Sequence, residues 1–336
     1  MRRRTLPRRA LHRLLIAAAL TTAFGPAAVA QPAAAADAYP SKPIRLVVPY
    51  PPGAANDTLG RALAQRLALV LGQPIVVENR PGAGGHLGAE QVARSPADGY
   101  TLLIGTSGLI AIGPHIFKKL TYDPQRDLVP ITRFATVPYV FGVPATLGLR
   151  GAPDLAALAK KTPGGLNYAS SGNGSVPHLC GELFNLRAGV KMIHVPYKGG
   201  AQAMNDVASG QVQLYCGGIP SLLPHVKAGR IKLVGVTSPN RSPLLPDEPT
   251  LAEQGIKGVE VNSWVGLLAP AGTPAAIVQR LAAETARIMA ANDMKQYTLS
   301  QGAEPEALNP AEFAADIKAE SDRWADVVKA SGAKID

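Results

Sequence analysis

The sequence predicts an α/β protein built as two lobes, each a mostly parallel sheet covered by helices. Short β-rich runs alternate with amphipathic helical segments, which is the βαβ rhythm of such a sheet. The rhythm stops over Ile131–Pro144 and then starts again, which indicates the second lobe. The 336 residues are 46% hydrophobic, enough for a substantial core, and 34 Gly and 30 Pro indicate many short turns.

The first lobe is predicted from strand-like and helix-like runs that follow one another closely. Apolar side chains recur at helical spacing from Leu59 to Val70, which predicts the first long helix. The expected strands are Ile44–Val48, Ile75–Glu78 and Thr101–Gly105, and the expected helices are Asp57–Leu71 and Gly88–Arg94.

The second lobe repeats the rhythm, and the chain then returns to the first lobe through a strand at Val259–Leu268. Two helices, Pro274–Ala291 and Pro310–Ser331, end the chain. We therefore expect residues 39–140 plus 241–336 to form lobe 1 and residues 141–240 to form lobe 2. The expected elements of lobe 2 are strands Leu166–Ala169, Met192–Pro196, Val212–Cys216 and Lys232–Thr237, with helices Pro177–Ala188 and Gly200–Ser209.

Residues 1–38 have the pattern of a cleaved secretory signal peptide. Six arginines precede an apolar stretch that is interrupted by Gly25-Pro26, and small residues follow it. Ala28-Val29-Ala30 and Ala36-Asp37-Ala38 are alternative cleavage sites. The other interpretation is a membrane anchor, but the uninterrupted apolar run is short for a bilayer span of about 20 residues. We expect a periplasmic protein.

The net charge of +10 is mostly a property of this leader. Removal of its six arginines by cleavage after Ala30 leaves a formal charge of +4. Nucleic-acid binding would need a clustered basic face, and the sequence has none, so we expect no nucleic-acid partner. The two cysteines, Cys180 and Cys216, are compatible either with a disulfide in an exported protein or with buried free thiols.

Two loops have the composition of an anion cradle. Residues 50–57 (YPPGAAND) lead into a predicted helix, and a helix N-terminus offers free N–H donors to a carboxylate or phosphate. Asn56 or Asp57 can cap that helix, and an ordinary tight turn is the alternative. Residues 170–175 (SSGNGS) also precede a helix and combine hydroxyls with a flexible backbone. His178 follows as either a ligand contact or a capping or core histidine.

Two further loops are candidates for ligand binding. Residues 79–88 (NRPGAGGHLG) resemble a dinucleotide loop, but Leu87 occupies the position of the last glycine of G-x-G-x-x-G, which argues against a nucleotide site. Residues 196–200 (PYKGG) place Lys198 at a strand end, where it can meet an anion or simply be solvated.

Signals for catalysis and metal binding are weak. The five histidines outside the leader form no H-E-x-x-H or other metal spacing, and no G-x-S-x-G elbow or P-loop occurs. We therefore expect no enzyme activity, no metal and no cofactor.

The sequence resembles the substrate-binding proteins of tripartite tricarboxylate transporters, the Bug-type receptors, over residues 39–336. The resemblance implies a two-lobed, type II-like periplasmic-binding-protein fold with a ligand cleft between the lobes. It also implies that the loops matching residues 50–57 and 170–173 hold one ligand carboxylate. The matching stretches are YPSKPIR (39–45), VPYPPG (48–53), VENRPGAGG (77–85), DGYTLL (98–103), LNYASSGNG (166–174), HVPYKG (194–199), VTS (236–238) and GLLAPAGTP (266–274).

The sequence departs from the family pattern at two positions. Ala54 stands where the second of two adjacent glycines is common, and Gly217-Gly218 stands where many relatives have Asp-Asn. The second departure removes a side-chain contact, so the ligand does not transfer by analogy. Dicarboxylates, tricarboxylates, aromatic acids, acidic amino acids and uncharged amides remain open.

We interpret the chain as a monomeric solute-binding protein that captures a small carboxylate for membrane transporter subunits. A ligand-sensing module for a membrane signalling receptor is the alternative, and a periplasmic hydrolase is a third hypothesis. The expected ligand-binding residues are Tyr50, Gly53, Ala54, Ala55, Asn56, Asp57, Ser107, Ser170, Ser171, Gly172, Asn173, His178, Tyr197, Lys198 and Gly217.

Overall fold

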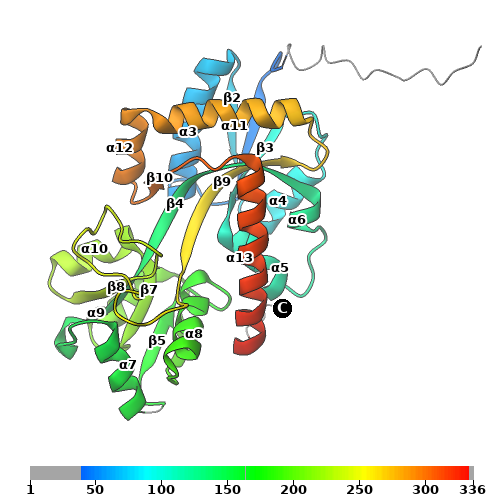
Figure 1. The fold of residues 1–336 in the computed structure, drawn as a ribbon. Helices are drawn as coiled ribbons and strands as arrows, with labels where there is room; N and C mark the ends of the chain where they lie inside the picture. Colours follow the sequence, from blue (N-terminus) through cyan, green and yellow to red (C-terminus); the bar gives the residue numbers. More distant parts are fainter. Residues whose placement is uncertain (1–38, 163, 333–336) are drawn as a thin grey trace, which may run out of the picture. The chain divides into compact units, whose positions relative to one another are not determined.

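The computed structural model describes residues 39–162 and 164–332 as helices packed on two connected β-sheets (Figure 1). The predicted signal peptide lies outside the described residues. Within the part of the chain that is described, no helix is both long and apolar enough to cross a bilayer.

The first sheet has the strand order β2-β1-β3-β9-β4. Its three N-terminal strands are parallel, as their β-rich runs predict, and β9 joins them antiparallel to β3. All residues of β3 are buried, as expected of a strand covered on both faces. The strands are β1 (Ile44–Val48), β2 (Ile75–Asn79), β3 (Thr101–Thr106) and β9 (Asn262–Pro270).

The second sheet has the order β4-β7-β5-β6, with β8 also paired to β4. Strands β5, β6 and β7 are parallel to one another, and β7 and β8 run antiparallel to β4. This sheet is therefore a second βα unit, as the restarted rhythm predicts. Its strands are β5 (Asn167–Ser170), β6 (Ile193–Pro196), β7 (Leu214–Gly218) and β8 (Ile231–Val236).

The two sheets share β4 (Leu128–Pro144), a strand of 17 residues that sequence reasoning treated only as a separator. Residues from Leu128 to Pro138 pair with β9, and residues from Tyr139 onwards pair with β7 and β8. In Figure 1, β4 and β9 run side by side. The separator was missed as a strand because prolines interrupt it, and register shifts in the β4–β9 pairing lie near Pro130.

Helices cover both sheets, and the longest, α13 (Pro310–Ser331), has the bounds that its apolar stripe predicts. Asn309 caps it in a capping box with Glu312. Sequence reasoning missed α5, α6, α7, α10 and α12. Helices α5 and α6 have four residues each, Pro224 lies inside α10, and α12 is rich in polar residues. The other helices are α3 (Ala55–Leu71), α4 (His86–Ala93), α5 (Gly113–Ile116), α6 (Pro124–Asp127), α7 (Ala152–Lys161), α8 (Val176–Ala188), α9 (Gly200–Ala208), α10 (Ile219–Lys227), α11 (Ala275–Ala290) and α12 (Asn292–Ser300).

Helix α13 contributes to two hydrophobic cores. Phe313 and Ile317 pack in the core that also holds Val47 and Leu103 of the first sheet. Trp324, Val327 and Val328 belong to a second core that also contains residues of α8 and β7. The C-terminal helix thus packs against elements from both sheets.

Candidate ligand-binding site

The first candidate loop connects β1 to α3. Gly53 has φ 81°, a left-handed conformation that suits glycine, and Ala54 is the N-cap in an extended conformation. Helix α3 begins at Ala55, two residues earlier than predicted. Among the described residues, the amides of Ala55 and Asn56 have no hydrogen-bond partner, as expected for the first N–H groups of a helix.

The side chain of Asp57 points into this loop and stabilises it through hydrogen bonds. Its carboxylate is almost fully buried and accepts hydrogen bonds from Gly53 N at 2.9 Å, Asn79 Nδ2 at 2.8 Å and Arg61 Nε at 3.0 Å. Asn79 Nδ2 also donates to Tyr50 O at 2.9 Å. Burial raises the pKa of Asp57, but the hydrogen bonds from Arg61, Gly53 and Asn79 outweigh it and hold that pKa below its usual value.

Tyr50 and Ser107 are tied to different neighbours. The Tyr50 hydroxyl lies 2.5 Å from Thr106 Oγ1 at the end of β3, and burial raises the pKa of Tyr50 to about 12. Ser107 is fully buried, and its hydroxyl donates to Glu320 of α13 at 2.5 Å. The hydroxyl groups of both expected ligand residues are therefore already hydrogen-bonded within the protein, that of Tyr50 to Thr106 and that of Ser107 to Glu320 of α13.

The second candidate loop connects β5 to α8 and is held by uncharged groups. Ser170 Oγ accepts from Gly172 N at 3.1 Å, donates to Gly172 O at 3.0 Å and lies 2.6 Å from His194 Nε2. Ser175 caps α8, since its Oγ accepts from His178 N. The side chains of Ser171 and Asn173 form no hydrogen bond to any other described residue, and Asn173 is exposed.

Two neutral imidazoles stack behind this loop. The ring centroids of His178 and His194 are 3.9 Å apart with an interplanar angle of 14°, and Tyr168 stacks on His194 at 5.0 Å. Gly174 N donates to His178 Nδ1 at 3.0 Å, so that nitrogen is unprotonated. Burial lowers the pKa of both His178 and His194 to about 4, so both rings are neutral at pH 7.

The Ser170–His194 contact has the spacing of a nucleophile–base pair, but the serine is closed off from a substrate. Ser170 Oγ lies 2.6 Å from His194 Nε2 and 3.0 Å from Gly172 O, and either atom can accept its single hydroxyl proton, depending on the His194 tautomer. A nucleophile must also reach its substrate, whereas Ser170 is fully buried. The pair therefore shapes the loop.

The loop at residues 196–200 lies beside the second candidate loop. Tyr197 N donates to Ser170 O at 3.0 Å, and its hydroxyl donates to Asp206 of α9 at 2.6 Å. Burial, and then the Asp206 hydrogen bond, raise the pKa of Tyr197 to about 12. Lys198 is exposed. The structure thus brings Ser170, His178 and Tyr197 together and leaves the ammonium group of Lys198 towards solvent.

Gly217 lies under the ring of Tyr215 on β7. A Cβ atom at Gly217 would come 2.3 Å from the Tyr215 ring, and one at Gly200 would come 2.7 Å from the Tyr215 hydroxyl. The ring therefore occupies space that a side chain at position 217 would need. This contact gives a physical reason for the glycine where many relatives have Asp.

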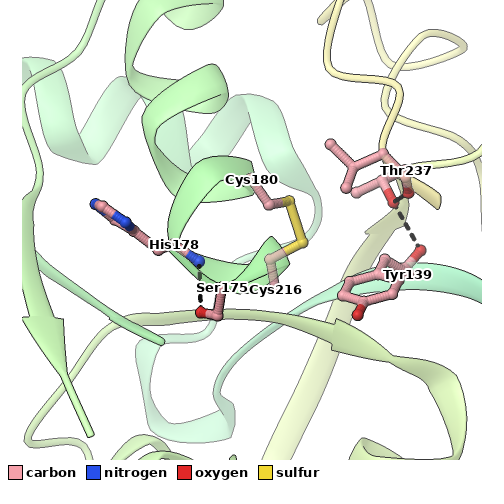
Figure 2. Close-up of a disulfide and its surroundings, with 7 residues drawn as sticks. Tyr139, Ser175, His178, Cys180, Cys216 and Thr237 are labelled. Atoms are coloured by element: carbon pink, nitrogen blue, oxygen red, sulfur yellow. Dashed lines mark hydrogen bonds between the residues drawn. A yellow bond between two sulfur atoms is a disulfide. The ribbon is translucent and has the colours of Figure 1, made fainter. Parts of the chain in front are cut away.

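A disulfide joins Cys180 of α8 to Cys216 of β7, which decides between the two alternatives for these residues. Figure 2 shows it beside the Ser175–His178 cap of α8. Cys180 lies in the first half of α8 and Cys216 is the central residue of β7, directly before Gly217, so the bridge joins this helix to the strand.

Several site residues were not found from the sequence. Tyr139 of β4 pairs with Gly218 of β7, and burial, with smaller contributions from Tyr215 and Tyr50, raises the pKa of Tyr139. Thr237 fixes the same segment, since its hydroxyl donates to Tyr139 O at 3.0 Å (Figure 2). A strand assignment at 131–144 would have pointed to Tyr139. Nothing in the local sequence around Asn79 or His194 indicates their partners.

The arrangement can bind an anion without a buried cation. Helices α3, α8, α9 and α10 each begin at or shortly after the C-terminal end of strands β1, β5, β6 and β7, so their free N–H groups lie at strand ends. The only charged side chains among the expected residues are Asp57, which is paired with Arg61, and Lys198. Backbone amides and neutral side chains therefore dominate the site.

The overall structure is similar to several solved structures, which include periplasmic binding proteins. The structure is similar to that of Rpa4515 of R. palustris with adipate (37% identity, 88% of this chain and all of that chain, TM-score 0.76). It is also similar to the periplasmic binding protein BugD (35%, 88% and 99%, 0.71) and to MatC of Rhodopseudomonas palustris with bound malate (33%, 86% and 100%, 0.71).

BugD is described as a periplasmic binding protein, and the matching family is one of receptors rather than enzymes, as expected for this chain from its sequence. The sequence model described as the tripartite tricarboxylate transporter family receptor matches residues 59–333. The chain therefore belongs to the tripartite tricarboxylate transporter receptor family of solute-binding proteins, which includes the Bug proteins.

Proposed function

We propose that this receptor captures a small carboxylate in the periplasm and delivers it to the membrane subunits of a tripartite transporter. One carboxylate of the ligand accepts hydrogen bonds from the amides of Ala55 and Asn56 and from the loop at residues 170–173. The observation that carries the proposal is the pair of unpartnered N–H groups at the start of α3, next to the loop fixed by Asp57.

The donors are sufficient for useful affinity. Hydrogen bonds to a charged group contribute about 1.5–3 kcal/mol each. Three or four of them support a dissociation constant of about 1 μM after the cost of ordering the ligand. The Gly53 N–H group already donates a hydrogen bond to Asp57. We therefore assign Ala55 and Asn56 as the residues of this loop whose N–H groups bind the ligand.

The proposed ligand is a small dicarboxylate, on the basis of the ligands of two solved relatives. Adipate and malate, which the solved relatives hold, are small dicarboxylates. Export through a cleaved signal at residues 1–38, a monomeric state and the absence of a nucleic-acid partner are parts of the same proposal.

The sharpest test removes one backbone donor and leaves the helix intact. Proline is favoured at the first helical position, and Ala54 has φ −64° and ψ 153°, which suits a residue before proline. Ala55→Pro therefore deletes one N–H group, and we expect it to weaken carboxylate binding about tenfold or more. Isothermal titration with adipate and malate, preceded by a thermal-shift screen of carboxylates, measures the change.

Ala275→Pro is the matched control, because Ala275 is the first residue of α11, which follows β9 and neither of the two candidate loops. Ser171→Ala and Asn173→Ala probe the second loop in the same titration. Unchanged affinity in Ala55→Pro and in both second-loop variants, with intact folding, would assign the ligand to another site.

A further inference from the structure

Glu320 is a buried carboxylate on α13 that no part of the proposed ligand site uses. It is 8% exposed and accepts three side-chain hydrogen bonds. The donors are Ser107 Oγ at 2.5 Å, Trp264 Nε1 at 2.6 Å and Trp324 Nε1 at 3.1 Å. Two of the donors lie outside α13, at the end of β3 and on β9, whereas Trp324 lies one turn after Glu320 on the same helix. The buried carboxylate therefore fixes α13 against both strands and orients the Trp324 side chain, because each lost donor weakens the stabilisation of a buried charge.

One arm of this network leads to the first candidate loop. Ser107 directly follows Thr106, whose hydroxyl lies 2.5 Å from the hydroxyl of Tyr50. Leu109 N also donates to Thr106 Oγ1, where the chain turns into a short π-helix at Gly108–Ile112. Glu320 therefore holds the end of β3 at the point where β3 holds Tyr50.

A second arm leads to the helix of the other loop. Trp324 is fully buried and belongs to the same hydrophobic core as Leu179 and Leu183 of α8. Helix α13 packs directly against α8, which begins immediately after the loop at residues 170–175. The third donor, Trp264, lies on β9, which pairs with both β3 and β4.

We infer that Glu320 is a positioning residue that couples the Tyr50–Asp57 loop to the start of α8 through Ser107 and Trp324. The inference rests on the proposed function only for the ligand-binding role of the two loops. A glutamine at this position has one acceptor oxygen in place of two and presents N–H groups to donors. Glu320→Gln therefore disrupts the network while keeping the size of the side chain.

Hydrogen exchange of the ligand-free full chain tests the coupling without any ligand. We expect Glu320→Gln to raise amide exchange about tenfold both at residues 50–57 and in the first turn of α8, beyond any change in global stability. Ser107→Ala should raise it only at residues 50–57, and Trp324→Phe only in α8. Urea unfolding of each variant gives the global reference.

Glu306→Gln is the matched control, because Glu306 is also a hydrogen-bonded, part-buried carboxylate. Its partners are Arg133 and Thr136 of β4, and it contacts neither Ser107 nor Trp324. Equal exchange at both loops in Glu320→Gln and the wild type, or the same rise in Glu306→Gln, would overturn the inference.

Titration with adipate and malate separates this result from the proposed function. Wild-type protein that binds no carboxylate contradicts the proposed function, and the exchange data still decide the coupling. Where the wild type binds one of the two acids, Glu320→Gln should weaken binding about tenfold and Glu306→Gln by less than about twofold.

Discussion

The loops at residues 50–57 and 170–175 occupy equivalent places, between a strand and a helix N-terminus, but they are held by different chemistry. An ion pair between the buried Asp57 carboxylate and the half-exposed Arg61 side chain, with Asn79, shapes the first loop. Hydroxyls and neutral imidazoles shape the second, and a disulfide secures its helix. The same local geometry can thus be stabilised by charge in one place and by neutral contacts and a covalent bond in the other.

The disulfide should give the largest effect. In the chain-entropy description, a bridge across 36 residues stabilises the folded state by about 4 kcal/mol. We expect Cys180→Ala/Cys216→Ala to lose about that much in the free energy of unfolding by urea. Thiol titration of unfolded wild-type protein without reductant is the control, and two free thiols there would show that the bridge is absent.

Asp57→Asn should have the next largest effect, because the amide offers one acceptor oxygen to three donors and presents its own N–H groups to the others. We expect a loss of about 3 kcal/mol in the free energy of unfolding. Since the pKa of Asp57 is lowered in the folded state, its contribution is present above the unfolded value near 4 and is lost as pH falls through the folded value.

Asp293→Asn is the control for charge, because the Asp293–Arg66 pair lies on the surface. It should change stability little. Similar losses in the two variants would mean that the first loop does not depend on the Asp57–Arg61 ion pair, and the contrast between the loops would disappear.

Ser170→Ala should reduce the free energy of unfolding by less, because all hydrogen-bond partners of Ser170 are uncharged. The substitution leaves Gly172 N and His194 Nε2 without the shared oxygen, at a cost of about 2 kcal/mol. Ser175→Ala, which removes the cap of α8, should cost about 1 kcal/mol. A larger loss in Ser175→Ala would place the main support of the second loop at its cap.

The sequence predicts the repeated βα units and both loops, because hydrophobic periodicity and helix-start residues are local signals. It does not predict the partners of those loops. Asn79 reaches Asp57 across 22 positions, His194 reaches Ser170 across 24, and Glu320 reaches Ser107 across 213. Such contacts depend on which strands become neighbours. The 17-residue β4 was missed for a related reason, since its prolines are tolerated only through irregular pairing.

The stacked histidines of the second loop should make folding stability depend on pH. This effect should be the smallest of the four near neutral pH, but its direction is well defined. Burial lowers the pKa of His178 and His194 to about 4, whereas the unfolded value is near 6.5. The unfolded state therefore binds more protons between these values, and stability falls as pH drops from 6.5 towards 4. Urea unfolding at a series of pH values measures the slope.

His194→Asn should reduce this slope without abolishing it, because His178 and the equally buried His86, whose pKa is also lowered to about 4, still titrate. His225→Asn is the control, since this histidine lies in the last turn of α10, away from the stacked pair. An unaltered slope in His194→Asn would mean that the stacked imidazoles do not set the acid sensitivity. The neutral character of the second loop would then rest on its hydroxyls alone.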